Sequence, residues 1–507
     1  MSAPRPASDD RRTLLRGAVL NAIGTAAEGA RAALPVLFIY LYSSRAYGVF
    51  ILCFSIVEIT SRCVVSGFAD GLVYLGARHD GASEGSGDEA RSADRLYRVI
   101  ANSLVWPMAL AVAAALVLWA GAGALYERHY AETQPASFVF TVRTLALLLP
   151  LNVLIAIPMA AIKARLMMGY DVVISNGALP LATVVLLIAL KIAGVDESAL
   201  AIAQIGGGVV AGTLAVWAYA TKFSLRRTIG ALRRFRLDRE VLDFSLPQCV
   251  NNLAGYGTAR IDAVILAAYA RPETVALYSI AVDVARVLRT IKQNFNGVFS
   301  PLVARKLGAG DRAGMQDALD LVTGWILDLL VPVLFVIVLF QKEIFLVYGQ
   351  TRPAPFYFLL LTGPILSCAF GLAGNMLLMT GHSRLLLVNS VAALLLNVVL
   401  NLLFIPRWGA LGSGVAAAVT TLSQSMLQLW QARRVEGFSP RMAAFGRPLV
   451  SAALLAAAGV AISSLPAGTS GGHLAPGPFA IRAALAAVAL GTYALFTLAR
   501  RRRQPAP

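Results

Sequence analysis

Apolar runs of about 20 residues alternate with short polar segments along the whole chain. An α-helix of that length crosses the hydrocarbon core of a bilayer, so each run is a candidate transmembrane helix. The pattern predicts an all-α polytopic membrane protein of about 14 spans, at residues 17–42, 48–76, 97–126, 138–162, 171–193, 198–221, 241–270, 274–304, 318–347, 356–380, 383–406, 409–432, 446–466 and 478–499.

Composition agrees with a membrane protein. The 507 residues are 58% hydrophobic and 14% charged, whereas a soluble chain of this size needs far more charge on its surface. The polar N-terminal residues precede no small-residue cleavage site, so we expect no cleaved signal peptide. No disulfide, metal site or cofactor is expected, because all four cysteines lie inside apolar runs as packing residues: Cys53, Cys63, Cys249 and Cys368.

Basic residues concentrate in alternate loops. With a cytoplasmic N-terminus, the inside segments hold 29 of the 44 Lys and Arg residues and the outside segments hold 8. The positive-inside rule therefore places both termini in the cytoplasm. The basic runs at 222–239 and 500–503 are interpreted as orientation signals near anionic lipid, so the net charge of +17 does not indicate nucleic-acid binding. The Ala- and Arg-rich composition suggests a bacterium, and we expect the protein in the inner (cytoplasmic) membrane.

The chain has two similar halves. A shift of 228 residues places Gly48–Phe50 on Ala276–Tyr278, and a shift of 213 residues places Asn176 on Asn389. The Gly-, Ser- and acid-rich segment 79–94 accounts for the difference and is interpreted as a flexible insertion. Because six spans separate the repeats, a pseudo-two-fold axis along the membrane normal relates the halves. The predicted parts are a cytoplasmic tail at 1–16, an N-terminal lobe at 17–221, a basic cytoplasmic linker at 222–240, a C-terminal lobe at 241–432, and two further spans with a basic tail at 433–507.

Four spans at equivalent places in the two halves carry polar residues at steps of three and four, which puts each set on one helix face. Charged side chains at membrane depth are costly and usually face a bundle interior or a water-filled cavity. The four stripes are Asn21, Thr25, Glu28 and Arg31; Ser55, Glu58, Arg62, Ser66 and Asp70; Gln248, Asn252, Tyr256, Arg260 and Asp262; and Arg286, Arg289, Thr290, Gln293, Asn296 and Ser300.

These charges have a structural and a functional interpretation, and the sequence leaves both open. Glu28 with Arg31, Glu58 with Arg62, and Asp283 with Arg286 have the spacing of intrahelical ion pairs. Arg289 and Lys292 have no acid at helical spacing, which favours a role in substrate binding. Asp328 has no cation nearby in sequence. The candidates for ion coupling are Glu28, Glu58, Asp283 and Asp328.

A cavity lined by these residue types suits a substrate with both negative charge and hydroxyl groups. Guanidinium groups bind phosphate oxygens bidentately, and amides serve sugar hydroxyls as donor and acceptor. A hydrophobic cation would instead require acids and aromatic rings. The candidate substrate-binding residues are Arg31, Arg62, Asn252, Tyr256, Arg260, Arg286, Arg289, Lys292 and Gln293.

Three segments carry a family resemblance: "NVVLNLLFIPRWGALGSGVAAAVTT" at 397–421, "TGHSRLLLVN" at 380–389, and the run from 243 to 283, which has Ala276 where Gly is usual. They resemble the polysaccharide flippases of the multidrug/oligosaccharidyl-lipid/polysaccharide exporter superfamily, over residues 13–432 and most strongly over 241–432. In physical terms, Pro406 is predicted to end a helix, and Gly409 and Gly412 to permit a tight turn. Asn397 and Asn401 either bond to a neighbouring helix or line the cavity.

The resemblance implies a transporter, not an enzyme. Such a protein moves a lipid-linked oligosaccharide, typically on polyprenyl pyrophosphate, to the outer leaflet by alternating access, for lipopolysaccharide or exopolysaccharide synthesis. The partners it implies are the lipid-linked substrate, membrane lipid and polysaccharide polymerase machinery around a monomer. Fourteen spans resemble the lipid II flippases, whose last two helices help form a groove for the lipid tail. The cationic cavity residues carry over by helix position to Arg31, Arg62, Arg260, Arg286 and Arg289.

Three rival functions remain. A peptidoglycan-precursor (lipid II) flippase has the same fold. A drug or cation antiporter normally has lobe acids without offsetting cations, whereas Glu28 and Glu58 have arginines beside them. A membrane-embedded glycosyltransferase or polymerase needs a sizeable outside loop with catalytic acids or His, which the short outside loops do not offer. The chain has no Gly-x-x-x-x-Gly-Lys loop, so we expect no ATP hydrolysis.

Overall fold

The computed structural model describes residues 34–82, 89–165, 167, 169–196, 198–308, 310–348, 354–370, 372–465, 469–470, 473–474 and 476–501. This part of the chain is helical apart from two antiparallel two-residue strands, β1 (Thr469–Ser470) and β2 (His473–Leu474). It forms two compact units, Met1–Ala276 and Leu277–Pro507, which are described separately. Most of the predicted first span, with Glu28 and Arg31, lies outside the described residues.

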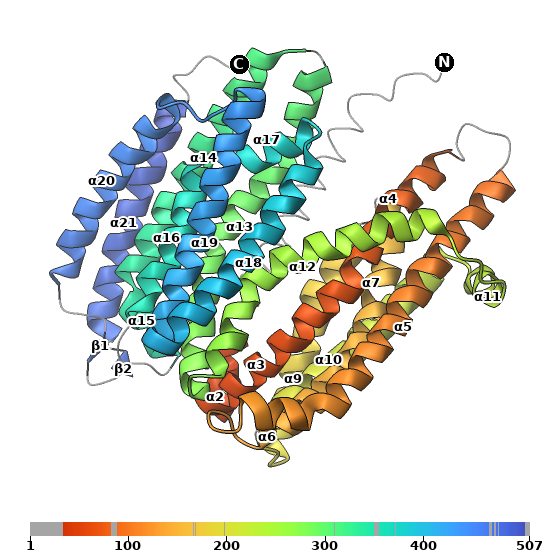
Figure 1. Cartoon of the computed structure of the whole chain (residues 1–507). Helices are drawn as coiled ribbons and strands as arrows, with labels where there is room; N and C mark the ends of the chain where they lie inside the picture. The colour runs from red at the N-terminus through yellow and green to blue at the C-terminus, as the bar shows by residue number, and fades with distance from the viewer. Residues whose placement is uncertain are drawn as a thin grey trace. The chain divides into compact units, whose positions relative to one another are not determined.

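The first unit consists of α2 (Leu34–Tyr42), α3 (Ser44–Ser61), the π-helix η1 (Arg62–Ser66), α4 (Gly67–Ala82), α5 (Glu89–His129), α6 (Ser137–Ala146), α7 (Leu148–Ala164), α8 (Gly169–Asp171), the π-helix η2 (Val172–Ala178), α9 (Leu179–Ile192), α10 (Ala199–Lys222), α11 (Leu225–Arg233) and α12 (Arg239–Ala267) (Figure 1). The second begins within α13 (Pro272–Gly308) and continues with α14 (Arg312–Leu339), α15 (Gln341–Val347), α16 (Phe356–Ala369), α17 (Ala373–Met379), α18 (Ser383–Trp408), α19 (Ala410–Gln431), the π-helix η3 (Ala432–Glu436), α20 (Ala443–Ser463) and α21 (Pro476–Arg501).

Among the described residues, nine helices are long and apolar enough to cross a membrane, or ten if α16 and α17, bent by 48° at their break, form one span. The prediction of an all-helical polytopic membrane protein is confirmed. Helices also occupy the predicted spans at α12, α13 and α19, but these do not pass the same test of length and apolarity. The total of about 14 spans therefore stays a prediction.

Each unit repeats one packing pattern. In the first unit α10 packs against α7 and α9, and in the second unit α19 packs against α16 and α18. These are the sixth, fourth and fifth predicted spans and their counterparts six spans later, so the pairing agrees with the internal similarity of the sequence. The predicted lobe boundary at 222–240 stays a prediction, whereas the compact units divide after Ala276.

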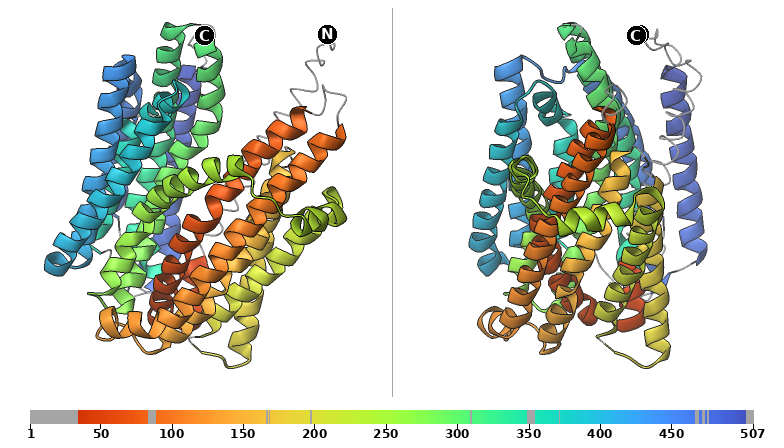
Figure 2. Two further views of the ribbon diagram at one scale, coloured as in Figure 1. Left: turned by 45° about the vertical axis from the view of Figure 1, so that its right-hand side comes forward. Right: turned by 90° about the vertical axis from the view of Figure 1, so that its right-hand side faces the viewer.

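Helix α12 packs across α3, η1 and α4, as both views of Figure 2 show for the lime-green and red helices. Side chains of α5 and of the loop after it bind backbone groups at both ends of α12. The buried Asn102 amide donates to the carbonyl of Arg236 (2.9 Å) and accepts from the amide of Asp238 (3.1 Å). At the other end, Gln134 donates to the carbonyl oxygens of Ala267 (3.1 Å) and Ala270 (3.0 Å). Helix α12 is therefore fixed within the first unit.

Helices α18 and α19 form a hairpin joined by buried amides. Asn401 donates to the carbonyl of Asn397 (2.8 Å), and Ser413 donates to the Asn401 side chain (3.0 Å). The sequence left open whether these asparagines bond across helices or line a cavity; Asn401 bonds across to Ser413 of α19, whereas Asn397 bonds to Asn401 within α18. Gly409, with φ 57° and ψ −135°, begins the turn in a conformation that L side chains rarely adopt. The prediction that Pro406 ends the helix was wrong: α18 continues to Trp408, because a proline in the last turn removes only one backbone hydrogen bond.

The predicted flexible insertion at 79–94 was also wrong where the structure describes it. Helix α4 continues to Ala82, and α5 begins at Glu89. The residues from 89 to 94 include Glu, Ala and Arg, which are good helix formers, so local propensity outweighs the Gly- and Ser-rich composition of the segment as a whole.

We predict that Gly67→Ala destabilises the first unit. A methyl group at Gly67 would collide with the backbone of Ser245 and Cys249 on α12, and backbone atoms cannot rotate away. Overpacking of this kind costs about 1–3 kcal/mol of unfolding free energy. The measurement is thermal unfolding of the purified protein in detergent. Gly123→Ala is the control, since that position has open space around it, and an equal loss in both variants would contradict the close approach.

Candidate functional site

Two of the predicted polar stripes face each other in the first unit. We call them the polar ladder: Glu58, Arg62, Ser66 and Asp70 from α3, η1 and α4, and Gln248, Asn252, Tyr256 and Arg260 from α12. Both sets repeat every four residues, and the two segments run in opposite directions along their contact. Each residue of one stripe therefore meets a partner in the other.

One end of the polar ladder consists of amides and a carboxylate. The Asn252 amide donates to a carboxylate oxygen of Asp70 (2.8 Å) and to the Ser66 hydroxyl (3.0 Å). Gln248 donates to the same Asp70 oxygen and to the Asn252 carbonyl, both at 3.3 Å. Asp70 is exposed, so this end offers hydrogen-bonding groups that an incoming hydroxyl could join or replace.

The other end holds two arginines and one acid. The Glu58 carboxylate lies 3.5 Å from Arg260 and 3.8 Å from Arg62, and the Arg62 guanidinium stacks 4.1 Å from the centre of the Tyr256 ring. The side chain of Arg260 is 10% exposed and that of Arg62 is 39% exposed. Among the described residues two arginines thus share the Glu58 carboxylate, and Arg62 is the one more accessible to an anion.

The π-helix η1 keeps the first stripe on one face. Four residues of an α-helix exceed one full turn, so a stripe with that spacing drifts around the helix. A π-helical turn is wider, and it rotates the following residues back. Because η1 spans Arg62–Ser66, the correction falls in the middle of the ladder. The sequence predicted the stripe but carried no signal that we recognised for the π-helix.

In the second unit, α13 carries the other predicted cations. Arg286 pairs with Asp283 at 3.3 Å, as its spacing suggested, and Gln293 is exposed. The Lys292 ammonium donates to the carbonyl and the hydroxyl of Ser367, both at 3.0 Å, in the last turn of α16. Lys292 thus binds the C-terminal end of α16 at the α16–α17 break, where the helix dipole stabilises a cation. Arg289 is half-buried on the same helix.

The remaining candidates are placed less completely. The side chains of Asn296 and Ser300 lie outside the described residues. Asp328 is half-buried in α14, and the Tyr493 hydroxyl of α21 donates to its backbone carbonyl. Across the part of the chain that the structure describes, no cluster of three or more His, Cys, Asp or Glu side chains could hold a metal ion.

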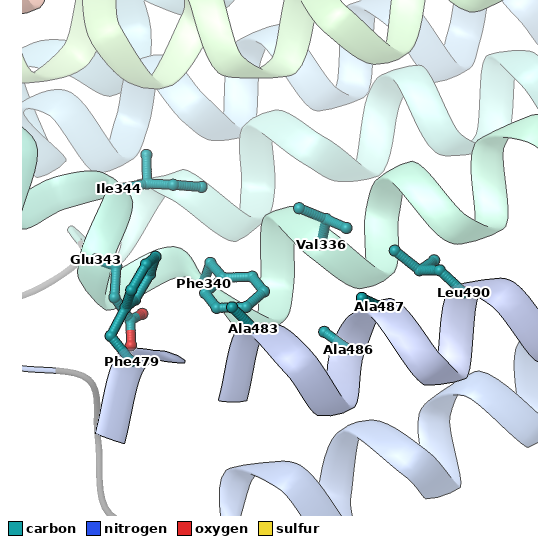
Figure 3. A pocket seen from close by; sticks show the side chains of 9 residues that line it. All are labelled: Val336, Phe340, Glu343, Ile344, Phe479, Ala483, Ala486, Ala487 and Leu490. Carbon is teal, nitrogen blue, oxygen red and sulfur yellow. The ribbon is translucent and has the colours of Figure 1, made fainter. Parts of the chain in front are cut away.

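A second feature is an apolar groove of about 430 Å³ between α14–α15 and α21 (Figure 3), whereas the resemblance to lipid II flippases implied a groove formed by the last two predicted spans. Phe340 and Phe479 meet at one end, with ring centres 5.9 Å apart, and alanines of α21 form the floor. Arg482 fixes α21 to α15 through a buried ion pair with Glu343 (2.5 Å) and a hydrogen bond to the carbonyl of Leu339 (2.9 Å). The groove lining is Val336, Phe340, Glu343, Ile344, Phe479, Ala483, Ala486, Ala487 and Leu490.

Comparison with known families confirms the resemblance seen in the sequence. The family model described as "Polysaccharide biosynthesis protein" matches residues 86–305, which include the motif at 243–283 but not the one at 397–421. A probable low-salt glycan biosynthesis flippase of Haloferax volcanii, Agl15, is 24% identical over 237 residues, which are 46% of this chain and 49% of the relative. The match thus spans about half the length of that curated relative.

Solved structures share the fold. An inward-facing multidrug resistance MATE family transporter of the MOP superfamily has a TM-score of 0.64 at 13% identity, covering 82% of this chain and 94% of that one. The outward-facing conformation of such a transporter scores 0.58 at 14% identity, with 84% and 95% covered. A MOP superfamily transporter from Pyrococcus furiosus, described as having a binding pocket of reverse polarity, scores 0.53 at 13% identity, with 83% and 95% covered. At these identities the likeness shows a MATE-like fold alone.

We predict strong energetic coupling between Glu58 and Arg260. Glu58→Gln and Arg260→Gln each remove one charge from a largely desolvated pair, so the double variant should lose less unfolding free energy than the sum of the two single variants. Contacting charges couple by about 0.5–3 kcal/mol. The measurement is a double-mutant cycle by SDS unfolding. The pair Asp317–Arg441 (3.0 Å), with both side chains more than half exposed, is the control and should couple more weakly; equal coupling would contradict a desolvated ladder.

Proposed function

We propose that this relative of polysaccharide biosynthesis proteins is a flippase for a lipid-linked oligosaccharide. It moves a polyprenyl-pyrophosphate repeat unit from the inner to the outer leaflet by alternating access, for assembly of a cell-surface polysaccharide. The single observation that carries the proposal is the polar ladder, which combines two arginines with two amides and two carboxylates inside apolar helices.

The chemistry of the ladder matches the two parts of such a headgroup. Arg62 and Arg260 offer guanidinium groups for phosphate oxygens, and Asn252 and Gln248 offer amides for sugar hydroxyls. In the absence of substrate, Glu58 supplies the anion that both arginines require. A substrate phosphate would replace Glu58 at the accessible Arg62. Arg62 would therefore pair with Glu58 when the site is empty and with the phosphate when substrate is bound.

The second unit supplies further cations and a break in a helix. Arg286 and Arg289 lie on α13, and Lys292 holds the end of α16 where the predicted tenth span bends by 48°. Transporters commonly use such discontinuous helices near their binding sites. In this proposal Arg286 and Arg289 attract the anionic headgroup, and Lys292 positions the break.

The apolar groove beside α21 suits the isoprenoid chain. Its walls are aliphatic and aromatic, and its one acid, Glu343, is neutralised by Arg482. A long hydrocarbon tail requires such a surface while the headgroup crosses the membrane.

The ladder also separates the proposal from its rivals. A cation antiporter requires an acid available to a proton or a cationic drug, whereas two arginines flank Glu58. A lipid II flippase remains the nearest alternative, because its substrate also joins a pyrophosphate to sugars. The identity of the accumulating precursor distinguishes these two.

We expect a strain that lacks this gene to accumulate a lipid-linked saccharide in the inner leaflet. The wild-type protein should clear it, whereas Arg62→Ala and Arg289→Ala should slow clearance about tenfold or more, since a hydrogen bond to a charged group contributes about 1.5–3 kcal/mol. The measurement is mass spectrometry of extracted lipids together with a leaflet-specific label. Arg407→Ala is the matched control, because that guanidinium is exposed at the end of α18 and bonds only locally to the carbonyl of Leu403. If sensitivity to cationic drugs changes and no saccharide lipid does, the proposal is wrong.

We expect Ala487→Trp to reduce translocation by filling the apolar groove. The indole would occupy space between α21 and α14 that the tail requires, without touching the arginines. Val488→Trp is the control, because Val488 lies next in sequence and is 63% exposed outside the groove lining. Both variants are compared with wild type for folded yield and precursor clearance, and similar clearance by the two tryptophan variants would rule out a role for the groove.

A further inference from the structure

The short helix α11, which joins α10 to α12, is anchored on one face to the rest of the first unit. Its N-cap Ser224 accepts from the amide of Arg227 (3.4 Å), and the Ser224 amide donates to the Tyr97 hydroxyl of α5 (3.0 Å). Thr228 is buried and shares a hydrogen bond of 2.7 Å with the hydroxyl of Tyr219 on α10. The orientation of α11 is therefore determined by the protein.

The neighbouring face of α11 is apolar and uncovered. Leu225 is 43% exposed and Ile229 is 49% exposed, and the helix is followed by the exposed side chains of Phe235 and Leu237. At 3.6 residues per turn, Leu225 and Ile229 lie on one side together with Leu232. Aliphatic side chains that are exposed on an otherwise basic helix are stabilised by insertion into the acyl region of a bilayer.

Four arginines of α11 lie at two different positions relative to this apolar face. By helical periodicity, Arg226 and Arg233 adjoin the apolar face on the side away from Thr228, whereas Arg227 and Arg234 lie opposite it. All four side chains are exposed, and no ion pair joins any of them to a carboxylate within the described ranges of the chain. When the apolar face points into a membrane, Arg226 and Arg233 lie at the level of the headgroups and Arg227 and Arg234 point into water.

We infer that α11 is a membrane-interface helix that binds the phosphates of anionic phospholipids through Arg226 and Arg233. Charge complementarity supports this occupant: residues 222–239 contain seven Lys and Arg and one acid, and they follow directly from the membrane-spanning α10. Guanidinium groups bind phosphate bidentately, and juxtamembrane basic residues concentrate at an anionic surface. The inference does not depend on the cargo of the transporter.

Binding at α11 would act on the polar ladder through the chain itself. Helix α12 begins six residues after α11 ends, with Asp238 capping it by accepting from the amide of Glu240 (3.1 Å). A lipid that holds α11 at the interface therefore holds the start of the helix that bears Gln248 and Asn252. The surface charge of the membrane would in this way set the depth of the candidate site.

The test compares two double variants that lose the same charge. The full-length protein is reconstituted in synthetic phosphatidylglycerol and phosphatidylcholine, without any substrate lipid, and retained lipids are counted by native mass spectrometry. We expect Arg226→Ala/Arg233→Ala to weaken phosphatidylglycerol retention by at least about 5-fold, a factor that corresponds to the loss of about 1 kcal/mol for a single basic residue at an anionic surface. Arg227→Ala/Arg234→Ala should change it far less. Equal losses in both variants, or no preference for phosphatidylglycerol in wild type, would overturn the inference.

A second measurement reports the depth of the helix directly. Cys63 is the exposed member of the four cysteines and is replaced by serine, leaving Cys53, Cys249 and Cys368 buried. A fluorophore on Ile229→Cys should then be quenched by phospholipids brominated on their acyl chains, and one on Arg227→Cys should not. An unquenched label at Ile229 would overturn the inference and leave a protein partner as the occupant of this face.

Discussion

Polar groups inside a bilayer have no water to bind, and this constraint explains the polar contacts between the helices. The stripe on α3, η1 and α4 contains an acid, an arginine and a second acid, and the stripe on α12 contains amides and an arginine. Neither stripe could face lipid without a large desolvation cost. Packed together they satisfy much of each other's hydrogen-bonding capacity, so the position of α12 follows from the polar residues as much as from the apolar ones.

The same constraint also produces polar contacts that are fully buried, unlike the partly exposed polar ladder. Asn401 and Ser413 are fully buried and join α18 to α19, and Arg482 with Glu343 is buried where α21 meets α15. These pairs exclude solvent on every side and serve the architecture. The polar ladder instead exposes Arg62 and Asp70 while it buries Arg260. Partial exposure of paired charges is what a binding site requires, because a ligand must reach groups that the fold already stabilises.

The α12 half of the polar ladder and the proposed lipid-binding helix α11 lie in one continuous segment of the first unit. Helix α12 carries half of the ladder, and Asn102 of α5 and Gln134 of the following loop bind backbone groups at the two ends of α12. Helix α11 precedes it with arginines and apolar side chains on separate faces.

The sequence by itself predicted the all-helical membrane-protein class, the similarity of the halves and the residues that form the two stripes of the polar ladder, because apolar run length and helical spacing are local properties. It did not determine that Lys292 points at the end of α16 or that Arg482 reaches Glu343, since both contacts join residues far apart in the chain. The π-helix at Arg62–Ser66, which packs against α12, and the pairing of Asn252 with Asp70 were decided by tertiary packing. In each case a partner helix supplies the hydrogen bond or the close contact that local propensity leaves undetermined.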